Sequence, residues 1–418
     1  MARLGASMRK MKDSGVEWIG QIPLEWDVCK LKYLIGIKSG DAIRNEDISS
    51  DGLYQVFGGG EIIGYTNKQN ANEKNLLIGR VGARCGCVTK PLNKVYATDN
   101  ALVVFTKENR NYFYDVLVSA DLNKLNSSNA QPLLTATKIK NVFVPHPSLA
   151  EQQRIADFLD EKCGEIDSIR SDIQKQIDIL NDYKKSVITE AVIKGLNPKA
   201  KLKDSGIEWI GKIPEGWNVI RLKDFSYMKG RIGWQGLKSE EFIDEGPYCV
   251  TGTDLKNGSI DWNTCYHISE ERYKMDANIH LKVGDLLITK DGTVGKLARV
   301  SYLPDKACLN SHLLIIRPLK QKFKNDFLFY MMSSDAFLHY CKYAENGTTM
   351  ASLSQEKMGK FKFPLPPLSE QKAIADYLDE KCFAIDATIA DKQKQLEILD
   401  EYKKSLIFEY VTGKKECV

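Results

Sequence analysis

The sequence lacks the features that mark several common classes of protein. No apolar run near the N-terminus of its 418 residues is long enough for a signal peptide or a membrane span. The ten cysteines are scattered, and no two C-x-x-C motifs are present to form a zinc site. Because dispersed thiols without a secretory signal are typical of a reducing compartment, we expect a cytoplasmic protein that does not engage a membrane.

Motifs for catalysis and for cofactor binding are also missing. A P-loop needs two glycines spaced around a phosphate and then Lys with Ser or Thr, but residues 292–296 are too short and Leu297 follows them. An adenine methyltransferase places Asn or Asp before Pro-Pro and an aromatic residue, whereas Leu365 precedes Pro366 and Pro367 here. The five histidines show no metal-ligand spacing: His146, His267, His280, His312 and His339. We therefore expect no catalytic residue, no metal and no cofactor on this chain.

Length and composition indicate a globular protein of more than one domain. A chain of 418 residues is too long for one ordinary domain, and about two to four domains is the usual range. The hydrophobic fraction of 43% and the charged fraction of 27% are ordinary for such a protein. The net charge of +4 permits nucleic-acid binding but does not by itself favour it, since solvated lysine faces are common.

Two stretches of the sequence occur twice. Residues 12–26 return as residues 203–217 with eleven of the fifteen positions identical, and residues 151–163 return as residues 370–382. We call these four stretches the frame segments. An internal repeat of this kind indicates that the chain contains two versions of one structural unit. Two such units predict a partner that presents two related surfaces.

The regions between the frame segments have diverged. We call them the variable regions, about residues 36–145 and 227–365. The repeat offset is 191 for the first frame segment (12 to 203) and 219 for the second (151 to 370), so the second unit holds 28 more residues. Weak matches at an intermediate offset of 210 indicate that the variable regions are colinear and share one fold. Similar frames around unlike regions suggest that the frames meet a shared partner while each variable region recognises something different. The alternative is free drift of loops after a recent duplication.

The second frame segment of each unit opens a predicted long helix. In the first unit, Ser148-Leu-Ala-Glu151 is the capping-box pattern of a helix start. From Leu149 to Thr189 such a helix is about 60 Å long. Its apolar residues recur every seven positions at Leu159, Ile166, Ile173, Leu180 and Val187, with Ile155, Ile169 and Tyr183 on the neighbouring stripe.

The second long helix is predicted from Leu368 to about Tyr410, directly after Pro366 and Pro367. Its apolar stripe is interrupted by Lys392, which leaves the register of the helix open. Two helices of this length and pattern most simply pack on each other. The alternative is that each lies on its own domain, but a helix this long would overhang the domain. We therefore favour mutual packing.

The variable regions are predicted to be globules of mixed α/β structure. Short apolar stretches bounded by Gly, Asn or Asp, such as residues 76–78, 101–105, 286–288 and 313–316, are typical of strands. The loops between them carry groups suited to DNA, since Arg and Lys pair with guanine, Asn and Gln pair with adenine, and Lys and Thr contact phosphates. The candidate DNA-binding residues are Arg80, Arg84, Asn129, Gln131, Arg231, Trp234, Gln235, Lys290, Lys296 and Thr348. Any one of them alone fits a solvated loop residue equally well, so the prediction depends on the whole set.

In these features the chain resembles the specificity subunit of a type I restriction-modification system. The resemblance covers nearly the whole length. Its most specific residues are the doubled Asp-Ser-Gly-Val/Ile-Glu-Trp-Ile-Gly line and the doubled Glu-Gln line that opens each long helix. The resemblance implies two target-recognition domains joined by two spacer helices that pack antiparallel. Each domain is then expected to read one half of a gapped, asymmetric site in double-stranded DNA, with the helices as a ruler between the halves.

The resemblance also implies partner subunits. Two modification subunits that methylate adenine are expected to dock on the helices and frame segments, and restriction subunits that act as motor and nuclease complete the complex. S-adenosylmethionine, ATP and Mg²⁺ are then used by these partners and not by this chain. The residues carried over to docking are Trp18, Ile19, Trp209, Ile210, Glu151, Gln152, Glu370 and Gln371. For the two Trp-Ile pairs, packing of the recognition domain on its own helix is the alternative.

The expected fold is α+β, with a pseudo-two-fold internal repeat and two mixed α/β target-recognition domains joined by two long antiparallel helices of coiled-coil type. The expected boundaries are 1–147 for the first recognition domain, 148–202 for the first helix and linker, 203–366 for the second recognition domain and 367–418 for the second helix and tail. We expect a non-catalytic subunit that recognises DNA sequence. A self-contained nuclease or methyltransferase, and a coiled-coil scaffold that binds proteins only, are the alternatives.

Overall fold

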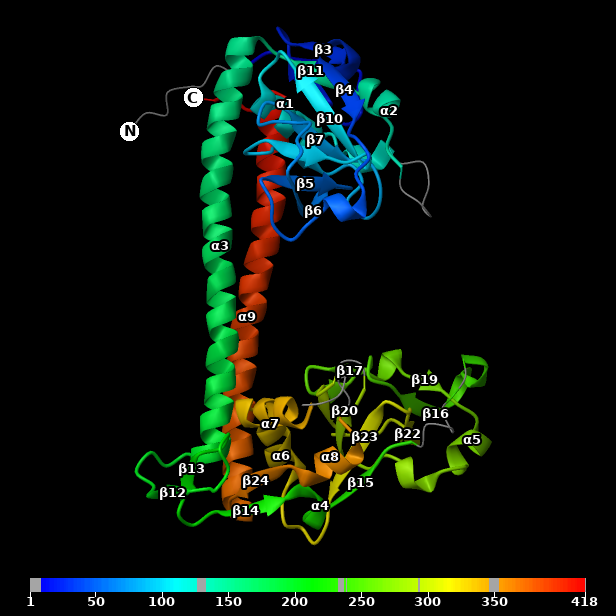
Figure 1. Ribbon diagram of the computed structural model, residues 1–418, viewed down its shortest axis with the longest axis vertical. Coiled ribbons are helices and arrows are strands. Elements are labelled where there is room, and N and C mark those ends of the chain that lie inside the picture. The colour runs from blue at the N-terminus through cyan, green and yellow to red at the C-terminus, as the bar shows by residue number, and fades with distance from the viewer. Residues whose placement is uncertain are drawn as a thin grey trace. The chain divides into compact units, whose positions relative to one another are not determined.

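The computed structural model describes residues 9–125, 133–231, 237, 239–291, 294–345 and 353–417 (Figure 1). The chain divides into two compact units. Unit 1 comprises Met1–Gln174 and Gln393–Val418, and unit 2 comprises Lys175–Lys392. Each unit therefore combines one variable region with a part of both long helices.

The two long helices are α3 (Leu149–Lys194) and α9 (Leu368–Val411), and α3 continues past the predicted end at Thr189. At the start of α3 the Ser148 hydroxyl accepts a hydrogen bond from the Glu151 backbone N–H (3.4 Å), as the capping box predicts. Glycines with positive φ follow both helices, Gly195 at 75° and Gly413 at 69°, which is the usual way to end an α-helix. Among the described residues, no helix is both long and apolar enough to cross a membrane.

Within unit 1 the two helix segments run antiparallel. Asp167 pairs with Lys403 (2.6 Å) and Arg170 pairs with Asp400 (2.9 Å), so the numbering rises on one helix as it falls on the other. Apolar side chains fill the seam between these ion pairs and the end of the unit. Those of α3 are Ile155, Leu159 and Ile166, and those of α9 are Leu406, Ile407 and Val411.

Unit 2 repeats this antiparallel packing. Lys184 Nζ lies 2.6 Å from the Asp386 carboxylate, and the Lys392 ammonium donates a hydrogen bond to the Gln176 side chain across the seam. The polar residue that interrupts the predicted stripe is therefore matched by a polar residue on the other helix. The apolar part of the seam is formed by Ile188 and Val192 of α3 with Ile374 and Leu378 of α9. The expected mutual packing of the two helices is confirmed in both units.

The strands of unit 1 form two sheets. An antiparallel sheet has the order β4-β10-β7-β8, and a second sheet has the order β6-β5-β9 with β5 and β9 parallel. Two further antiparallel pairs are β1 with β2, which belong to the first frame segment, and β3 with β11, where β3 directly follows that segment. The elements are β1 (Met11–Asp13), β2 (Gln21–Pro23), β3 (Asp27–Lys30), β4 (Ile35–Ser39), β5 (Tyr54–Gly58), β6 (Glu61–Thr66), β7 (Leu76–Gly79), β8 (Val88–Thr89), β9 (Val95–Ala97), β10 (Ala101–Thr106), α1 (Arg110–Ser119), α2 (Ala136–Lys140) and β11 (Phe143–His146).

Unit 2 has the same plan. Its four-stranded sheet is β15-β23-β20-β21, its three-stranded sheet is β19-β16-β22 with β16 and β22 parallel, and β12 pairs with β13 and β14 with β24. Helix α6 takes the place of α1. The elements are β12 (Leu202–Asp204), β13 (Lys212–Pro214), β14 (Asn218–Arg221), α4 (Leu222–Phe225), β15 (Ser226–Lys229), β16 (Ile243–Val250), β17 (Leu255–Lys256), β18 (Ser259–Ile260), β19 (Tyr266–His267), α5 (Glu270–Lys274), β20 (Leu286–Thr289), β21 (Leu297–Arg299), β22 (Ala307–Leu309), β23 (Leu313–Pro318), α6 (Asn325–Met332), α7 (Asp335–Glu345), α8 (Gln355–Lys360) and β24 (Lys362–Leu365).

The central strands are apolar along their whole length because both faces of the four-stranded sheet are covered. In unit 1, Leu76 and Ile78 belong to the cluster that includes α1 and the long helices, whereas Leu77 belongs to the cluster on the three-stranded sheet. In unit 2, Leu286 packs toward the long helices and Leu287 toward the second sheet. Successive side chains of a strand point to opposite faces, so a continuous apolar run predicts a strand buried on both sides.

One carboxyl group lies inside the core of unit 1. Asp115 of α1 is 3% exposed, and its buried Oδ2 accepts no hydrogen bond. Burial raises the pKa of Asp115 to about 7; nearby Lys90 and Lys403 oppose this shift, and Asp160 adds to it. Because the folded pKa lies above the ordinary value of about 3.9, ionisation of Asp115 destabilises the folded state.

The free energy of unfolding is therefore expected to fall as the pH rises from about 4 to about 7, and to level off above that range. The substitution Asp115→Asn removes the ionisation. The difference in free energy of unfolding between the variant and the natural chain should increase by on the order of 2 kcal/mol from pH 5 to pH 8. Urea unfolding followed by circular dichroism at several pH values measures this gain. Asp157→Asn, at an exposed position of α3, is the matched control, and parallel pH profiles for all three proteins would contradict the assignment.

Candidate functional site

A buried tryptophan closes the first frame segment of each unit. Trp26 is 1% exposed, and its Nε1 donates a hydrogen bond to Glu151 Oε2 at the start of α3 (2.9 Å). Trp217 is 2% exposed, and it donates in the same way to Glu370 Oε2 at the start of α9 (3.0 Å). The two frame segments of each unit are thus joined by an equivalent internal bond.

The end of the other long helix packs on each tryptophan. A Cβ on Gly195, just after α3, would come 3.1 Å from the Trp217 ring and 3.0 Å from Glu370. A Cβ on Gly413, just after α9, would come 3.0 Å from the Trp26 ring. Both positions have positive φ, so the close approach and the backbone conformation each favour glycine. Each tryptophan is therefore the meeting point of the frame hairpin, the start of one long helix and the end of the other.

The glutamines beside these glutamates are buried and satisfied within the chain. Gln152 and Gln371 are both 0% exposed. The side-chain oxygen of Gln152 accepts from the Asn109 backbone N–H (3.1 Å), and that of Gln371 accepts from the Lys324 backbone N–H (2.8 Å). Asn109 and Lys324 are the N-cap residues of α1 and α6. The prediction that the glutamines dock a partner is wrong, because their side chains instead join a recognition domain to its long helix.

The Trp-Ile pairs divide between interior and surface. Ile19 is 0% and Ile210 6% exposed, so both belong to the cores and the prediction that they dock a partner is wrong.

Trp18 is half-buried, and its Nε1 donates to the Phe143 carbonyl oxygen (3.1 Å). Trp209 is also half-buried and packs on the rings of two tyrosines of α7. Beside it lies a groove of about 630 Å³, which is lined by Tyr340, Tyr343, Lys357, Lys360 and Lys362 among others. Docking by the two tryptophans stays a prediction.

Four of the candidate DNA-binding residues lie on equivalent hairpins. Arg80 and Arg84 are in the loop from β7 to β8, and Lys290 and Lys296 are in the loop from β20 to β21. Arg80 and Lys290 occupy the same position, because each backbone oxygen accepts a 2.8 Å hydrogen bond from a following leucine, Leu134 or Leu353. The side chain of Arg84 is 61% exposed, and Lys296 is exposed. These four residues therefore share one loop of the recognition fold, and their contact with DNA stays a prediction.

Arg231 is a correction to the predicted set. It is 2% exposed, its Nε donates to the Leu309 carbonyl oxygen (3.0 Å), and its Nη2 lies 3.5 Å from Cys308 Sγ. The guanidinium is therefore part of the interior of unit 2 and is not presented to a ligand. The remaining candidates lie outside the residues that the structure describes; they are Asn129, Gln131, Trp234, Gln235 and Thr348.

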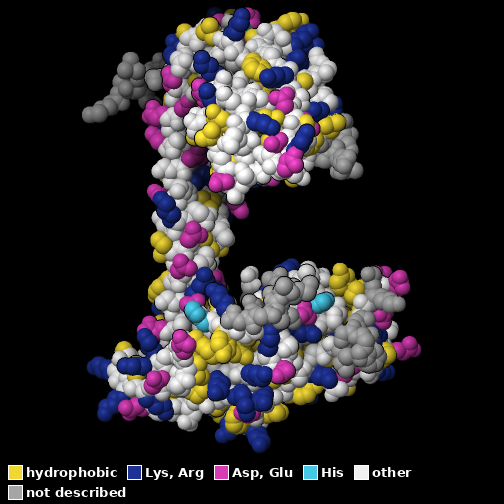
Figure 2. Space-filling model, in the orientation of Figure 1, with side chains coloured by type: hydrophobic (Ala, Val, Ile, Leu, Met, Phe, Trp, Pro, Cys, Tyr) yellow, Lys and Arg dark blue, Asp and Glu magenta, His cyan; other side chains and the backbone are white. Residues whose placement is uncertain are grey.

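The long helices carry an exposed apolar pair that the sequence analysis did not single out. Ile179 and Tyr183 on α3 are 66% and 54% exposed, and Ile398 and Tyr402 on α9 are 56% and 55% exposed. The two pairs are related by the repeat offset of 219, within a line Ile-Leu-x-x-Tyr-Lys-Lys-Ser that occurs twice. The heptad position of Tyr183 predicts an apolar stripe beside the seam, but its side chain is exposed. Apolar side chains interrupt the charged surface of the helices in the space-filling view (Figure 2). Repetition of this line was the signal that could have revealed the pair.

Comparison with known proteins gives a consistent result. The family model described as type I restriction modification DNA specificity domain matches residues 23–178 and 214–398. Two specificity subunits of type I restriction enzymes from Methanocaldococcus jannaschii are similar over most of the chain. MjaVIII is 26% identical and covers 94% of this chain and 94% of its own length, and the putative MjaX is 29% identical and covers 93% and 84%. A solved structure on complex assembly and conformational transition of the type I R-M system contains a chain with 16% sequence identity and a TM-score of 0.67. The match covers 94% of this chain and 99% of that chain, and it supports the assigned fold.

The Trp217–Glu370 bond yields a stability prediction. Glu370→Ala leaves the buried indole N–H without its acceptor and is expected to lower the free energy of unfolding by about 1–3 kcal/mol. Glu380→Ala removes an exposed glutamate from the same helix and should change it by less than about 0.5 kcal/mol. Urea unfolding of the isolated chain measures both variants. Equal stability of the two would show that the glutamate does not serve the fold.

Proposed function

The chain belongs to the type I restriction-modification DNA specificity family, and from this membership we propose that it reads a bipartite, asymmetric and gapped site in double-stranded DNA. The recognition domain of each unit contacts one half of the site. The long helices determine the length of the gap. The chain contributes sequence recognition and no catalysis of its own.

The observation that carries this proposal is the pair of equivalent hairpins with unlike loops. The loop from β7 to β8 carries Arg80 and Arg84, whereas the loop from β20 to β21 carries Lys290 and Lys296. Arginine pairs bidentately with guanine, whereas lysine offers a flexible point charge. Two loops at the same place in one fold, but with different side chains, suit two half-sites of different sequence.

The exposed Ile-Tyr pairs support docking of two modification subunits. Each unit presents one pair on its helix segments, Ile179 with Tyr183 in unit 2 and Ile398 with Tyr402 in unit 1. Exposed apolar side chains mark contact surfaces when they lie together. A pair that occurs once per unit suits a partner that binds twice. Restriction and translocase subunits join through this assembly, and S-adenosylmethionine, ATP and Mg²⁺ serve the partner subunits.

The half-site assignment is tested by exchanging one variable region. Replacing residues 36–145 with the equivalent region of another specificity subunit should change one half of the methylated sequence and leave the other half as it was. Mapping of methylated adenines in DNA treated with the reconstituted complex reads out both halves. A change in both halves would contradict the modular assignment.

The same assay separates recognition from catalysis. With S-adenosylmethionine and DNA, the purified chain should leave the DNA unmodified until the modification subunit is added. Methylation by the chain alone would instead identify a self-contained enzyme. If the chain shows no affinity for DNA at low salt, with or without the modification subunit, it is a protein scaffold, since phosphate contacts make DNA binding strongest at low salt.

The docking surface is tested with substitutions at exposed positions, where folding is least affected. Ile179→Ser and Ile398→Ser should each weaken one of the two binding sites for the modification subunit by roughly tenfold, from the loss of one buried apolar side chain. Sedimentation of the complex at limiting concentration should then show one bound modification subunit in place of two. Ile169→Ser is the matched control, because Ile169 is 50% exposed on α3 but its repeat equivalent is Thr388. Loss of binding in the Ile169→Ser control alone would contradict the assignment of docking to the Ile-Tyr pairs.

A further inference from the structure

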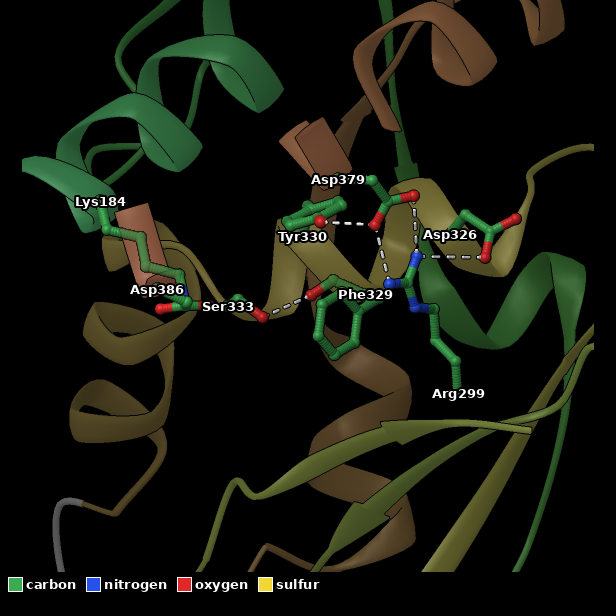
Figure 3. Close-up of polar contacts among 8 residues, drawn as sticks. All are labelled: Lys184, Arg299, Asp326, Phe329, Tyr330, Ser333, Asp379 and Asp386. Atoms are coloured by element: carbon green, nitrogen blue, oxygen red, sulfur yellow. Dashed lines mark hydrogen bonds and ion pairs between the residues drawn. The ribbon is translucent and has the colours of Figure 1, made fainter. Parts of the chain in front are cut away.

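An arginine ties the β20–β21 hairpin to the long helix of unit 2. Arg299, the last residue of β21, donates from Nη2 to Asp379 Oδ1 (2.8 Å) and from Nη1 to Asp379 Oδ2 (3.3 Å). Asp379 lies on α9 and also accepts a hydrogen bond from the Tyr330 hydroxyl (2.7 Å). Figure 3 shows the guanidinium between the carboxylates of Asp379 and Asp326, with the Phe329 ring beside it. The arginine carbon Cζ lies 4.7 Å from the centroid of that ring.

Partial burial and paired hydrogen bonds stabilise the contact between Arg299 and Asp379. The Arg299 side chain is 28% exposed and that of Asp379 is 44% exposed, so the pair is only partly screened by water. Burial opposes ionisation of Asp379, but the hydrogen bonds from Arg299 and Tyr330 outweigh it and lower the pKa of this carboxyl. Paired hydrogen bonds between a guanidinium and a carboxylate fix orientation as well as distance. Arg299 therefore holds the end of β21 at one place on α9.

Unit 1 contains the same arrangement made from different residues. Lys90, directly after β8, pairs with Asp160 Oδ1 on α3 (2.8 Å), and Asn111 donates to Asp160 Oδ2 (2.6 Å). The Lys90 ammonium lies 4.5 Å from the centroid of the Tyr114 ring. Asp160 and Asp379 are related by the repeat offset of 219. Counted from the N-cap residues of α1 and α6, Tyr114 occupies the position of Phe329, and Asn111 that of Asp326.

Each contact acts on the hairpin that carries the candidate DNA-binding residues. The loop from β7 to β8 holds Arg80 and Arg84, and Lys90 comes at the far end of β8. The loop from β20 to β21 holds Lys290 and Lys296, and Arg299 closes β21. Strand β8 is the edge strand of its sheet. Strand β21 is the last strand of its sheet, but it also meets Gly258 through an isolated bridge, where the Arg299 backbone N–H donates to the Gly258 carbonyl oxygen (2.9 Å). In each unit, the ion pair to the long helix adds a side-chain restraint at the end of the last strand of the four-stranded sheet.

We propose that Asp160 and Asp379 are positioning residues. Asp160 holds the β7–β8 hairpin on α3, Asp379 holds the β20–β21 hairpin on α9, and each thereby determines base discrimination at one half-site. The inference rests on the proposed function, in which the hairpins face DNA. Base-edge hydrogen bonds in the major groove need accurate placement of the side chains that make them. A hairpin released from the helix keeps its charges and its affinity for phosphate, but it loses accurate placement against the bases.

The test uses Asp379→Asn and Asp160→Asn in the full chain assembled with its modification subunits. Asparagine keeps the size of the side chain and an oxygen for the Tyr330 hydroxyl, and it removes the charge that holds Arg299. Methylation rates are measured on the cognate site and on DNA with one base pair changed in either half-site. Asp379→Asn should lower discrimination by roughly tenfold at the half-site read by unit 2 and leave the other unchanged. Asp160→Asn should give the converse result.

Two further variants make the outcome decisive. Asp386 lies on α9, as Asp379 does, but its ion pair is with Lys184 of α3 and does not involve the recognition domain. Asp386→Asn breaks this ion pair and should leave discrimination at both half-sites unchanged. Arg299→Lys keeps the charge but loses the paired geometry, so its discrimination should lie between those of the natural chain and Asp379→Asn. The inference is overturned if Asp379→Asn alters both half-sites equally or no more than Asp386→Asn does. Absence of half-site discrimination in the natural complex would overturn the proposed function itself.

Discussion

A buried indole N–H needs an acceptor, and in this chain that need joins the frame of each unit. Trp26 and Trp217 obtain theirs from Glu151 and Glu370, and the end of the opposite long helix closes over the ring at a glycine. Loss of one acceptor leaves a desolvated donor and loosens three chain segments at once. The next contact outward runs from a buried glutamine to the backbone N–H at the start of α1 or α6. Any residue except proline supplies that N–H, so the recognition domains can change sequence without losing their attachment.

Much of the architecture follows from sequence pattern alone. The apolar stretches at 76–78 and 286–288 are strands buried on both faces, and the capping box marks the start of α3. The roles of individual frame residues do not follow, because a residue retained in both copies for an internal bond looks the same as one retained for a partner. The sequence for this reason predicts that Gln152 docks a partner, whereas its side chain is buried. The prediction of DNA contact by Arg231 fails for another reason, because only the folded structure reveals that its guanidinium meets the Leu309 carbonyl oxygen.

The two units show that the fold preserves geometry more strictly than residue identity. A cation at or directly after the end of the last sheet strand, an aspartate on the long helix and a ring on the intervening helix recur in both units, as Lys90 with Asp160 and Arg299 with Asp379. Counted from the N-cap residues, Asp115 occupies the position of Tyr330. Unit 2 therefore places a neutral hydroxyl donor where unit 1 places a buried carboxyl group.

The division of the helices means that the two units differ in how their parts are distributed along the sequence. Unit 2 is one uninterrupted stretch, Lys175–Lys392, whereas unit 1 needs Gln393–Val418 in addition to Met1–Gln174. The seam and the tryptophan site of unit 1 therefore need residues that the chain supplies only after the whole of unit 2. All the parts of unit 2, in contrast, lie within one continuous stretch of sequence. Without Gln393–Val418, the apolar stripe of α3 in unit 1 lacks its partners Leu406, Ile407 and Val411 and is open to water.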